Sequence, residues 1–163
     1  MSTHSPARSE AAFTLSETLI SIAVTVISLV AFFAATSQAI RIVRSGKEIA
    51  AASQMLQQRI ETFRYAPPWT NATTPSGIAT LIKNAAATSS TFHDATETFT
   101  VSPYPAGGTP LVVTRSPDGV ISMSGPSMAS EKCVKFTVAV TWTGLGGAAR
   151  SRQVSTIMTK GGL

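Results

Sequence analysis

A run of 23 consecutive residues, 18–40, contains no Asp, Glu, Lys, Arg or His. As an α-helix this run would be about 34 Å long, which is enough to cross the ~30 Å hydrocarbon core of a bilayer. A carboxylate, Glu17, stands immediately before the run, where an uncompensated charge next to lipid costs free energy. The run therefore predicts a membrane-spanning helix. The position of Glu17 at the start of this helix predicts that a partner group interacts with its carboxylate.

The composition of the 163-residue chain predicts one domain with attachments. Charged residues make up 13% of it, against about 25% in an average soluble domain. The formal net charge of +5 is scattered without a run of five like charges, which indicates a mixed solvated surface. Cys133 is the only cysteine, so an intramolecular disulfide and a cysteine-based metal site are both excluded, and we expect a buried structural thiol.

A secretory signal peptide is the first alternative to a membrane span. The residues Ser37-Gln38-Ala39 have the small-x-Ala pattern of a cleavage site, and cleavage there would release a secreted β domain that starts near Ile40. The apolar core of such a peptide is normally about 7–15 residues, however, and this run is longer. A plain single-pass membrane protein is the other alternative of this kind.

The charges on either side of the run conflict with one orientation of the span. Arg8 is opposed by Glu10 on the amino-terminal side, whereas the carboxyl-terminal side carries only basic residues at first, namely Arg41, Arg44 and Lys47. The positive-inside rule alone would place the carboxyl-terminal side in the cytoplasm.

The hexad Ala12-Phe13-Thr14-Leu15-Ser16-Glu17, followed by the apolar run, resembles the class III leader of type IV prepilins. The same signature marks the pseudopilins of type II secretion. The family pattern is a short hydrophilic leader, then Gly, then Phe-Thr-Leu-x-Glu. Residues 1–12 fit the leader, and Phe13 to Glu17 fit the motif, with Ala12 in the place of the usual Gly.

The resemblance implies processing and assembly through the amino terminus. A prepilin peptidase would cut between Ala12 and Phe13 on the cytoplasmic side, and the new amino group of Phe13 would be methylated. Glu17 would then pair with the Phe13 amine of a neighbouring subunit. The implied partners are this peptidase, other pilin or pseudopilin subunits, the inner-membrane assembly platform and membrane lipid. The implied location is the inner membrane, single-pass with a periplasmic carboxyl-terminal domain, and then a filament.

The same residues have an ordinary local interpretation. Thr14-x-x-Glu17 is a capping box, in which Thr14 caps a helix and Glu17 returns to the Thr14 amide. The carboxylate would also face the positive end of the helix macrodipole. The cap and the assembly role are compatible in one molecule.

Residues 41–65 continue a helical pattern beyond the span. Apolar residues recur every seven positions and form a stripe on one face, which predicts that this half of the helix docks onto a folded domain; the stripe comprises Ile42, Ile49, Leu56 and Phe63, joined by Ile60. Gly46 has a low helix propensity, so the helix is less stable at this position than it would be with Ala. Arg44 and Glu48 have the spacing of a weak ion pair.

The remainder of the chain predicts a β-rich head. Pro67 and Pro68 end the long helix, residues 69–76 read as a loop, and residues 78–87 form a short helix. Residues 96–104, 111–115 and 120–123 have strand patterns, the last two joined by a turn at Pro117-Asp118-Gly119. Strict alternation over residues 134–143, a glycine loop at 144–147 and a strand from near Arg152 predict an antiparallel hairpin.

The expected fold class is therefore α+β, with a small antiparallel sheet packed on the second half of a long amino-terminal helix. The expected segments are a leader (1–12), a membrane-embedded half-helix (13–40), an amphipathic half-helix (41–65) and a globular head (66–163). The resemblance implies a function for this arrangement, that of a structural subunit of a type IV pilus or type II secretion pseudopilus. Many major pilins have a disulfide near the carboxyl terminus, which a chain with one cysteine cannot form, so the resemblance favours a minor subunit or a pseudopilin.

No pattern of catalytic or metal-binding residues is present, so we expect no enzyme activity, cofactor or metal. His4 lies in the leader, and His93 has only Asp94 and Glu97 nearby, which we interpret as surface residues. One alternative function remains, a nucleic-acid-binding tip subunit. It depends on basic residues near the terminal hairpin that would contact phosphates, namely Lys132, Lys135, Arg150 and Arg152.

Overall fold

One helix, α1, extends over 50 residues from Leu15 to Arg64 in the computed structural model, which describes residues 14–65, 68–85, 92–105, 107–144 and 146–161. No proline occurs between Phe13 and Ala66, so nothing in the sequence forces a break. The chain divides into two units, Met1–Ile42 and Val43–Leu163, and each is described by itself.

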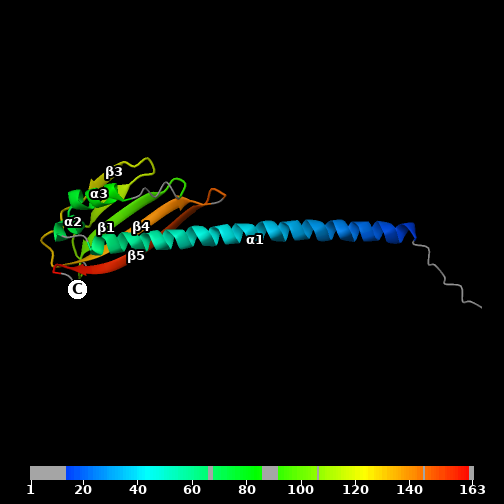
Figure 1. Ribbon diagram of the computed structural model, residues 1–163, viewed down its shortest axis with the longest axis horizontal. Helices are drawn as coiled ribbons and strands as arrows, with labels where there is room; N and C mark the ends of the chain where they lie inside the picture. The colour runs from blue at the N-terminus through cyan, green and yellow to red at the C-terminus, as the bar shows by residue number, and fades with distance from the viewer. Residues whose placement is uncertain (1–13, 66–67, 86–91, 106, 145, 162–163) are drawn as a thin grey trace, which may run out of the picture. The chain divides into compact units, whose positions relative to one another are not determined.

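The second unit contains a five-stranded antiparallel sheet with the order β3-β2-β1-β4-β5 (Figure 1). The central strand β1 pairs with β2 on one side and β4 on the other, while β3 and β5 form the two edges. The strands are β1 (Thr96–Pro103), β2 (Leu111–Arg115), β3 (Ile121–Ser124), β4 (Cys133–Thr143) and β5 (Ala149–Thr159).

One face of this sheet forms the core. Period-two alternation sends every second side chain of β1, β2 and β4 to the same face, and the register places Phe99 opposite both Val113 and Val138. The opposite face carries mainly Thr and Ser side chains, such as Thr98, opposite Thr114 in the register. The alternating apolar residues of β4 are all buried, namely Val134, Phe136, Val138, Val140 and Trp142.

The second half of α1 packs on the inner face of the sheet, which confirms the α+β fold class. The ring of Phe63 lies 5.3 Å from that of Phe99 and 4.6 Å from that of Phe136, measured between centroids. Such aromatic clusters stabilise a core beyond the burial of area. The buried apolar residues of this helix are Ala52, Leu56, Ile60 and Phe63.

The predicted docking stripe extends too far toward the amino terminus. Leu56, Ile60 and Phe63 are buried and Ile49 is half-buried, but Ile42 leaves 65% of its surface exposed. The seven-residue repeat identifies the face that docks but not the point at which contact with the sheet begins. In the structure the first fully buried residue of α1 is Ala52.

Two short helices replace the predicted loop at 69–76. α2 spans Trp69–Thr73 and α3 spans Pro75–Asn84, so the prediction that the short helix begins at residue 78 is wrong. The physical reason is local: Thr74 caps α3 by accepting the Gly77 amide at 3.1 Å, and Pro75 occupies the first turn, where its missing N–H costs nothing. α3 buries Ile78 and Ile82.

The predicted hairpins are confirmed, with one difference in length. The turn between β2 and β3 is closed by the Gly119 amide, which donates to the Ser116 carbonyl at 2.9 Å, and Gly119 has φ +85°. β5 begins at Ala149 rather than near Arg152, because the ladder continues through Trp142 opposite Arg150. The alternation of apolar residues could not mark that extension, since Arg150 and Ser151 are polar. Cys133, expected to be buried, is half-buried.

Candidate functional site

The amino-terminal end of α1 carries the predicted capping box. The Thr14 amide donates to Glu17 Oε2 at 3.0 Å, and the Glu17 amide donates to Thr14 Oγ1 at 3.4 Å. The Thr14 hydroxyl also donates to Glu17 Oε2 at 3.0 Å. These bonds satisfy two of the orphan amides of the first turn.

One oxygen of Glu17 remains available after the cap has formed. Both bonds to Thr14 use Oε2, and no described residue donates to Oε1. The cap therefore orients the carboxylate at the start of the helix without exhausting its capacity to accept hydrogen bonds.

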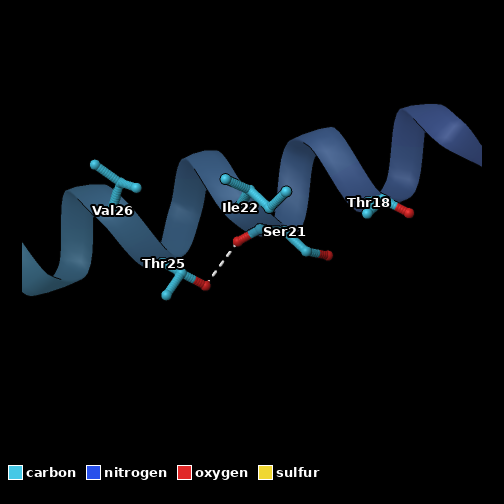
Figure 2. Close-up of a pocket in the computed structure, with 5 residues that line it drawn as sticks. All are labelled: Thr18, Ser21, Ile22, Thr25 and Val26. Atoms are coloured by element: carbon cyan, nitrogen blue, oxygen red, sulfur yellow. Dashed lines mark hydrogen bonds between the residues drawn. The ribbon is translucent and has the colours of Figure 1, made fainter.

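Hydroxyl side chains line one face of the following helix, and they bond back to their own backbone. Thr25 donates to the Ser21 carbonyl at 2.7 Å, as Figure 2 shows, and Ser28 and Thr36 bond in the same way to the carbonyls four residues earlier, at 2.8 and 2.9 Å. Because each of these donors is satisfied internally, the hydroxyls do not oppose an apolar environment.

These hydroxyls share a face with Glu17. At 100° per residue, the hydroxyl positions 14, 18, 21, 25, 28 and 36 fall, together with Glu17, within an arc of about 100°. Thr18, Ser21 and Thr25 border a shallow depression on this face, flanked by Ile22 and Val26 (Figure 2). Large apolar side chains occupy most of the rest of the circumference. Phe32, five turns after Thr14, also falls within the arc, so the small, polar face is continuous from Thr14 to Ser28 only.

The first unit leaves this apolar surface uncovered by protein. Every large apolar side chain from Leu15 to Phe33 exposes more than half of its surface. Exposed apolar surface on this scale marks contact with lipid or with other protein chains. Among the described residues, α1 is the one helix that is long and apolar enough to cross a membrane, judged by length and composition.

The basic residues proposed for nucleic-acid contact do not form one patch. The register places Arg150 opposite Trp142 and Lys135 opposite Ile157, so they lie near different ends of the β4–β5 ladder. Their odd-even offset also sends them to opposite faces of the sheet. Lys132 precedes β4, at the end of the ladder remote from Arg150 and Arg152.

The acidic residues near His93 also separate. His93 Nδ1 and the Asp94 carboxylate lie 2.8 Å apart and are exposed, whereas Glu97 is only 1% exposed and pairs with Arg59 Nη2 at 3.0 Å. Within the described part of the chain, no group of three or more His, Cys, Asp or Glu residues is arranged to hold a metal ion.

Two polar contacts between α1 and the sheet were missed by the sequence analysis. The first is the buried Arg59–Glu97 pair, whose signal was present because Glu97 alternates in phase with Phe99 and Val101. The second involves Glu48, whose Oε2 lies 3.6 Å from Arg150 Nη1 and accepts a bond from Trp142 Nε1 at 3.4 Å. Arg150 therefore takes the place of the predicted partner Arg44.

The fold and the exposed helix define a class: an α+β protein whose long amino-terminal helix has an uncovered apolar segment and whose sheet packs on its second half. No protein-family model, no curated protein and no solved structure matches the chain.

Proposed function

We propose that the chain is a structural subunit of a type IV pilin-like filament, either a minor pilin or a pseudopilin of type II secretion. A prepilin peptidase removes residues 1–12 and the new amino group of Phe13 is methylated. Both residues of that cleavage site, Ala12 and Phe13, lie outside the described residues. Before assembly the subunit is anchored in the inner membrane, and its globular head (residues 66–163) lies in the periplasm. It is then assembled into the filament through its amino-terminal helix.

The state of Glu17 carries this proposal. A capping carboxylate at the start of a helix is common, but here it adjoins 23 uncharged residues and keeps Oε1 without a partner among the described residues. A charge left at the mouth of a membrane helix is costly unless it is paired. The ammonium group of Phe13 in a neighbouring subunit would supply that pair, and the pair would mainly fix the register between helices, since buried ion pairs add little net stability.

The hydroxyl face of α1 supports assembly through this helix. Small side chains allow helices to approach closely within lipid, and internally bonded hydroxyls impose no penalty there. Because Glu17 lies on the same face, close packing of that face would bring the carboxylate toward the neighbouring subunit. The bulky apolar residues on the remaining circumference would contact lipid before assembly.

The mass and amino-terminal sequence of the mature protein test the proposal directly. We expect a chain that begins at methylated Phe13. A chain that begins at Ile40 would identify a secreted domain, and an intact Met1 would identify a plain single-pass membrane protein. Either of these two results would overturn the proposal.

A charge-specific experiment tests the role of Glu17 separately from the cap. Glu17→Gln keeps an oxygen that can accept the Thr14 amide, since Gln also forms capping boxes, but removes the charge. We expect this variant to insert into the membrane normally and to be incorporated into filaments at least ~10-fold less than the wild type, given that each 1.4 kcal/mol lost is tenfold. Glu17→Ala, which removes both features, should insert as well and be incorporated no better.

Glu61→Gln is the matched control, because Glu61 is an exposed carboxylate on the same helix whose side chain has no partner among the described residues. It should be incorporated like the wild type. Equal incorporation of Glu17→Gln and the wild type would show that the charge of Glu17 has no part in assembly.

A further inference from the structure

The two edges of the sheet differ in length and in protection. β3 has four residues, whereas β5 pairs with β4 over eleven consecutive positions, without a bulge, a proline or a glycine (Figure 1). Proteins commonly protect an edge with a short strand or with such interruptions, because an edge has unpaired backbone groups to which another chain can bond. β3 is protected by its shortness, and β5 has none of these features.

The pairing shows which backbone groups of β5 point away from the sheet. At the two ends of the ladder, the Lys160 amide donates to the Lys132 carbonyl at 2.8 Å and the Gly144 amide donates to the Ala148 carbonyl at 2.9 Å. Hydrogen-bonded positions alternate in an antiparallel pair, so the even-numbered residues of β5 bond to β4. The odd-numbered residues direct their N–H and C=O groups outward, namely Ser151, Gln153, Ser155 and Ile157. In the part of the chain that the structure describes, no strand pairs with them.

Side chains on both faces of β5 are incompletely covered. Val154 and Met158 pack against the core but are half-buried, whereas their partners in the register, Val138 and Val134, are buried. Ile157, on the opposite face, leaves 48% of its surface exposed. A strand added beside β5 would give these side chains cross-strand neighbours, and such pairs stabilise a sheet.

The charges on and around β5 are all positive. No acidic residue follows Glu131 in the sequence, and five basic residues do, namely Lys132, Lys135, Arg150, Arg152 and Lys160. Arg150 contacts Glu48, as described above. Arg152 is exposed on the same face of the strand and forms no ion pair with any described residue.

These charges decide between two occupants of the edge. A second copy of the chain would bring its own β5, which adds two arginines and no carboxylate. Like charges on neighbouring strands destabilise pairing, and charged edge residues commonly prevent association between copies. A strand with a carboxylate beside Arg152 would instead gain a cross-strand ion pair.

We infer that β5 binds an extended, acidic segment of a different protein, which adds a sixth strand to the sheet. The outward backbone groups of β5 supply the affinity, and Arg152 selects a segment with a carboxylate at the matching position. The inference depends on the second unit alone, so it requires neither the membrane span nor the filament of the proposed function.

A synthetic peptide with blocked ends, Thr-Val-Val-Thr-Thr-Val-Thr-Glu-Thr, is the probe. Paired antiparallel with residues 159–151, it places its glutamate opposite Arg152 and valines opposite Val154 and Met158. Fluorescence anisotropy of the labelled peptide with the full chain in neutral detergent micelles measures binding. At about 50 mM salt, where screening is weak, we expect saturable binding with a Kd below ~1 mM. The same peptide with Lys in place of Glu should bind at least ~5-fold more weakly, because it sets like charges side by side.

Two variants at one position test the outward backbone groups. Gln153→Pro removes an N–H that points away from β4, and proline is tolerated at edge positions of this kind. We expect this variant to fold and to bind the acidic peptide at least ~5-fold more weakly, since one bond is lost and the proline ring blocks the approach. Gln153→Thr keeps the N–H and is the matched control, which should bind like the wild type. Arg152→Gln should remove the preference for the Glu peptide over the Lys peptide.

Methylated peptides provide a test that does not depend on the folding of a variant. The amide of the fifth peptide residue would face β5 opposite Ser155, and the amide of the sixth would face away. N-methylation of the fifth should abolish binding, and N-methylation of the sixth should leave it unchanged. No binding of the acidic peptide, or equal effects of the two methylations, would overturn the inference. Self-association of the chain in micelles that Gln153→Pro abolishes would make a second copy the occupant and would also overturn it.

Discussion

At the scale of single residues, the inner face of the sheet contains charges where an apolar core would be expected. Glu97 pairs with Arg59 and stands opposite Arg115 in the β1–β2 register. Arg115 donates from Nη1 to the Ile82 carbonyl at 2.8 Å. This carbonyl lies in the last turn of α3, and a cation is stabilised at the carboxyl-terminal end of a helix. The buried arginines thus tie α1 and α3 to the same sheet.

We predict that Arg59→Met destabilises the second unit by about 3–5 kcal/mol, because it leaves the carboxylate of Glu97 buried without its partner. Arg59→Met/Glu97→Leu should recover most of this loss, since an apolar pair of similar volume often replaces a buried ion pair without cost. Urea unfolding of the full chain in detergent micelles, followed by tryptophan fluorescence, measures both.

Arg64→Met is the control for this prediction, because Arg64 is an exposed arginine in the last turn of the same helix. It should change the free energy of unfolding by no more than ~0.5 kcal/mol. A double variant as unstable as the single one would mean that Arg59 acts through contacts other than Glu97.

The turn after β2 gives a second prediction at this scale. Gly119 has φ +85°, a conformation that costs an L-residue roughly 1 kcal/mol or more. Gly119→Ala should therefore lower the free energy of unfolding by about that amount. Gly107→Ala should be neutral or slightly stabilising, because Gly107 does not have a positive φ and no atom lies within 4 Å of its added Cβ. Equal effects of the two variants in urea unfolding would contradict the assignment of strain to Gly119.

At the scale of elements, two features of α1 set its behaviour: a hydroxyl face in the first half and a docking stripe in the second. The sequence predicted the docking stripe, since periodicity reports which residues share a side of a helix. It could not report where the docking partner ends, and for that reason Ile42 was wrongly included. The extent of contact depends on the length of β4 and β5, which is set by pairing elsewhere in the chain.

Two glycines on helices should respond in opposite ways to the same substitution. Gly46→Ala should stabilise the chain by about 0.5–1 kcal/mol, because Gly46 lies within α1 and a Cβ there would meet no atom within 4 Å. Gly77→Ala should destabilise it by about 1–3 kcal/mol, because the Cβ would lie 2.6 Å from Asn71 Cα and would force α2 and α3 apart. Urea unfolding in micelles measures both changes, and a loss of stability in Gly46→Ala would contradict the open environment of that residue.

The strands show which parts of a fold a sequence specifies. The terminal hairpin was predictable because Val134 to Trp142 alternate without interruption and a glycine loop follows. The helix α2 was not, since five residues are too few to display a period of 3.6. The Thr74-Pro75 step was the signal for α3, and it was available from the sequence as an N-cap followed by proline. The strand order in the sheet depends on long-range pairing that no local pattern encodes.

Only those interactions of the candidate site that join residues close in the sequence were predicted. The Thr14–Glu17 cap follows from a short spacing, and the structure confirms it. The contact of Arg150 with Glu48 joins residues 102 positions apart, so only the folded sheet could reveal it.

At the scale of the whole molecule, burial is confined to one of the two units. Every buried residue among those described lies between Ala52 and Gly144, within the unit Val43–Leu163. The described part of the first unit, residues 14–42, has an apolar surface and no buried residue, so this part of the helix depends on lipid or on other chains. The two units therefore have different requirements: one needs an apolar environment and the other folds around its own core.

This division predicts that residues 43–163 fold without the first unit. A protein that begins at Val43 should be soluble and should unfold cooperatively. Its Tm should lie within about 4 °C of that of the full chain in micelles, which corresponds to less than about 1 kcal/mol for a domain of this size.

A protein that begins at Gln54 is the control, because it lacks Ala52 and the Glu48 contacts with Trp142 and Arg150. It should melt at a clearly lower temperature, since both apolar packing and the polar contacts with β4 and β5 are removed. Calorimetry of the three proteins decides the matter: a Val43 protein without a cooperative transition would show that the head requires the membrane half of α1 to fold.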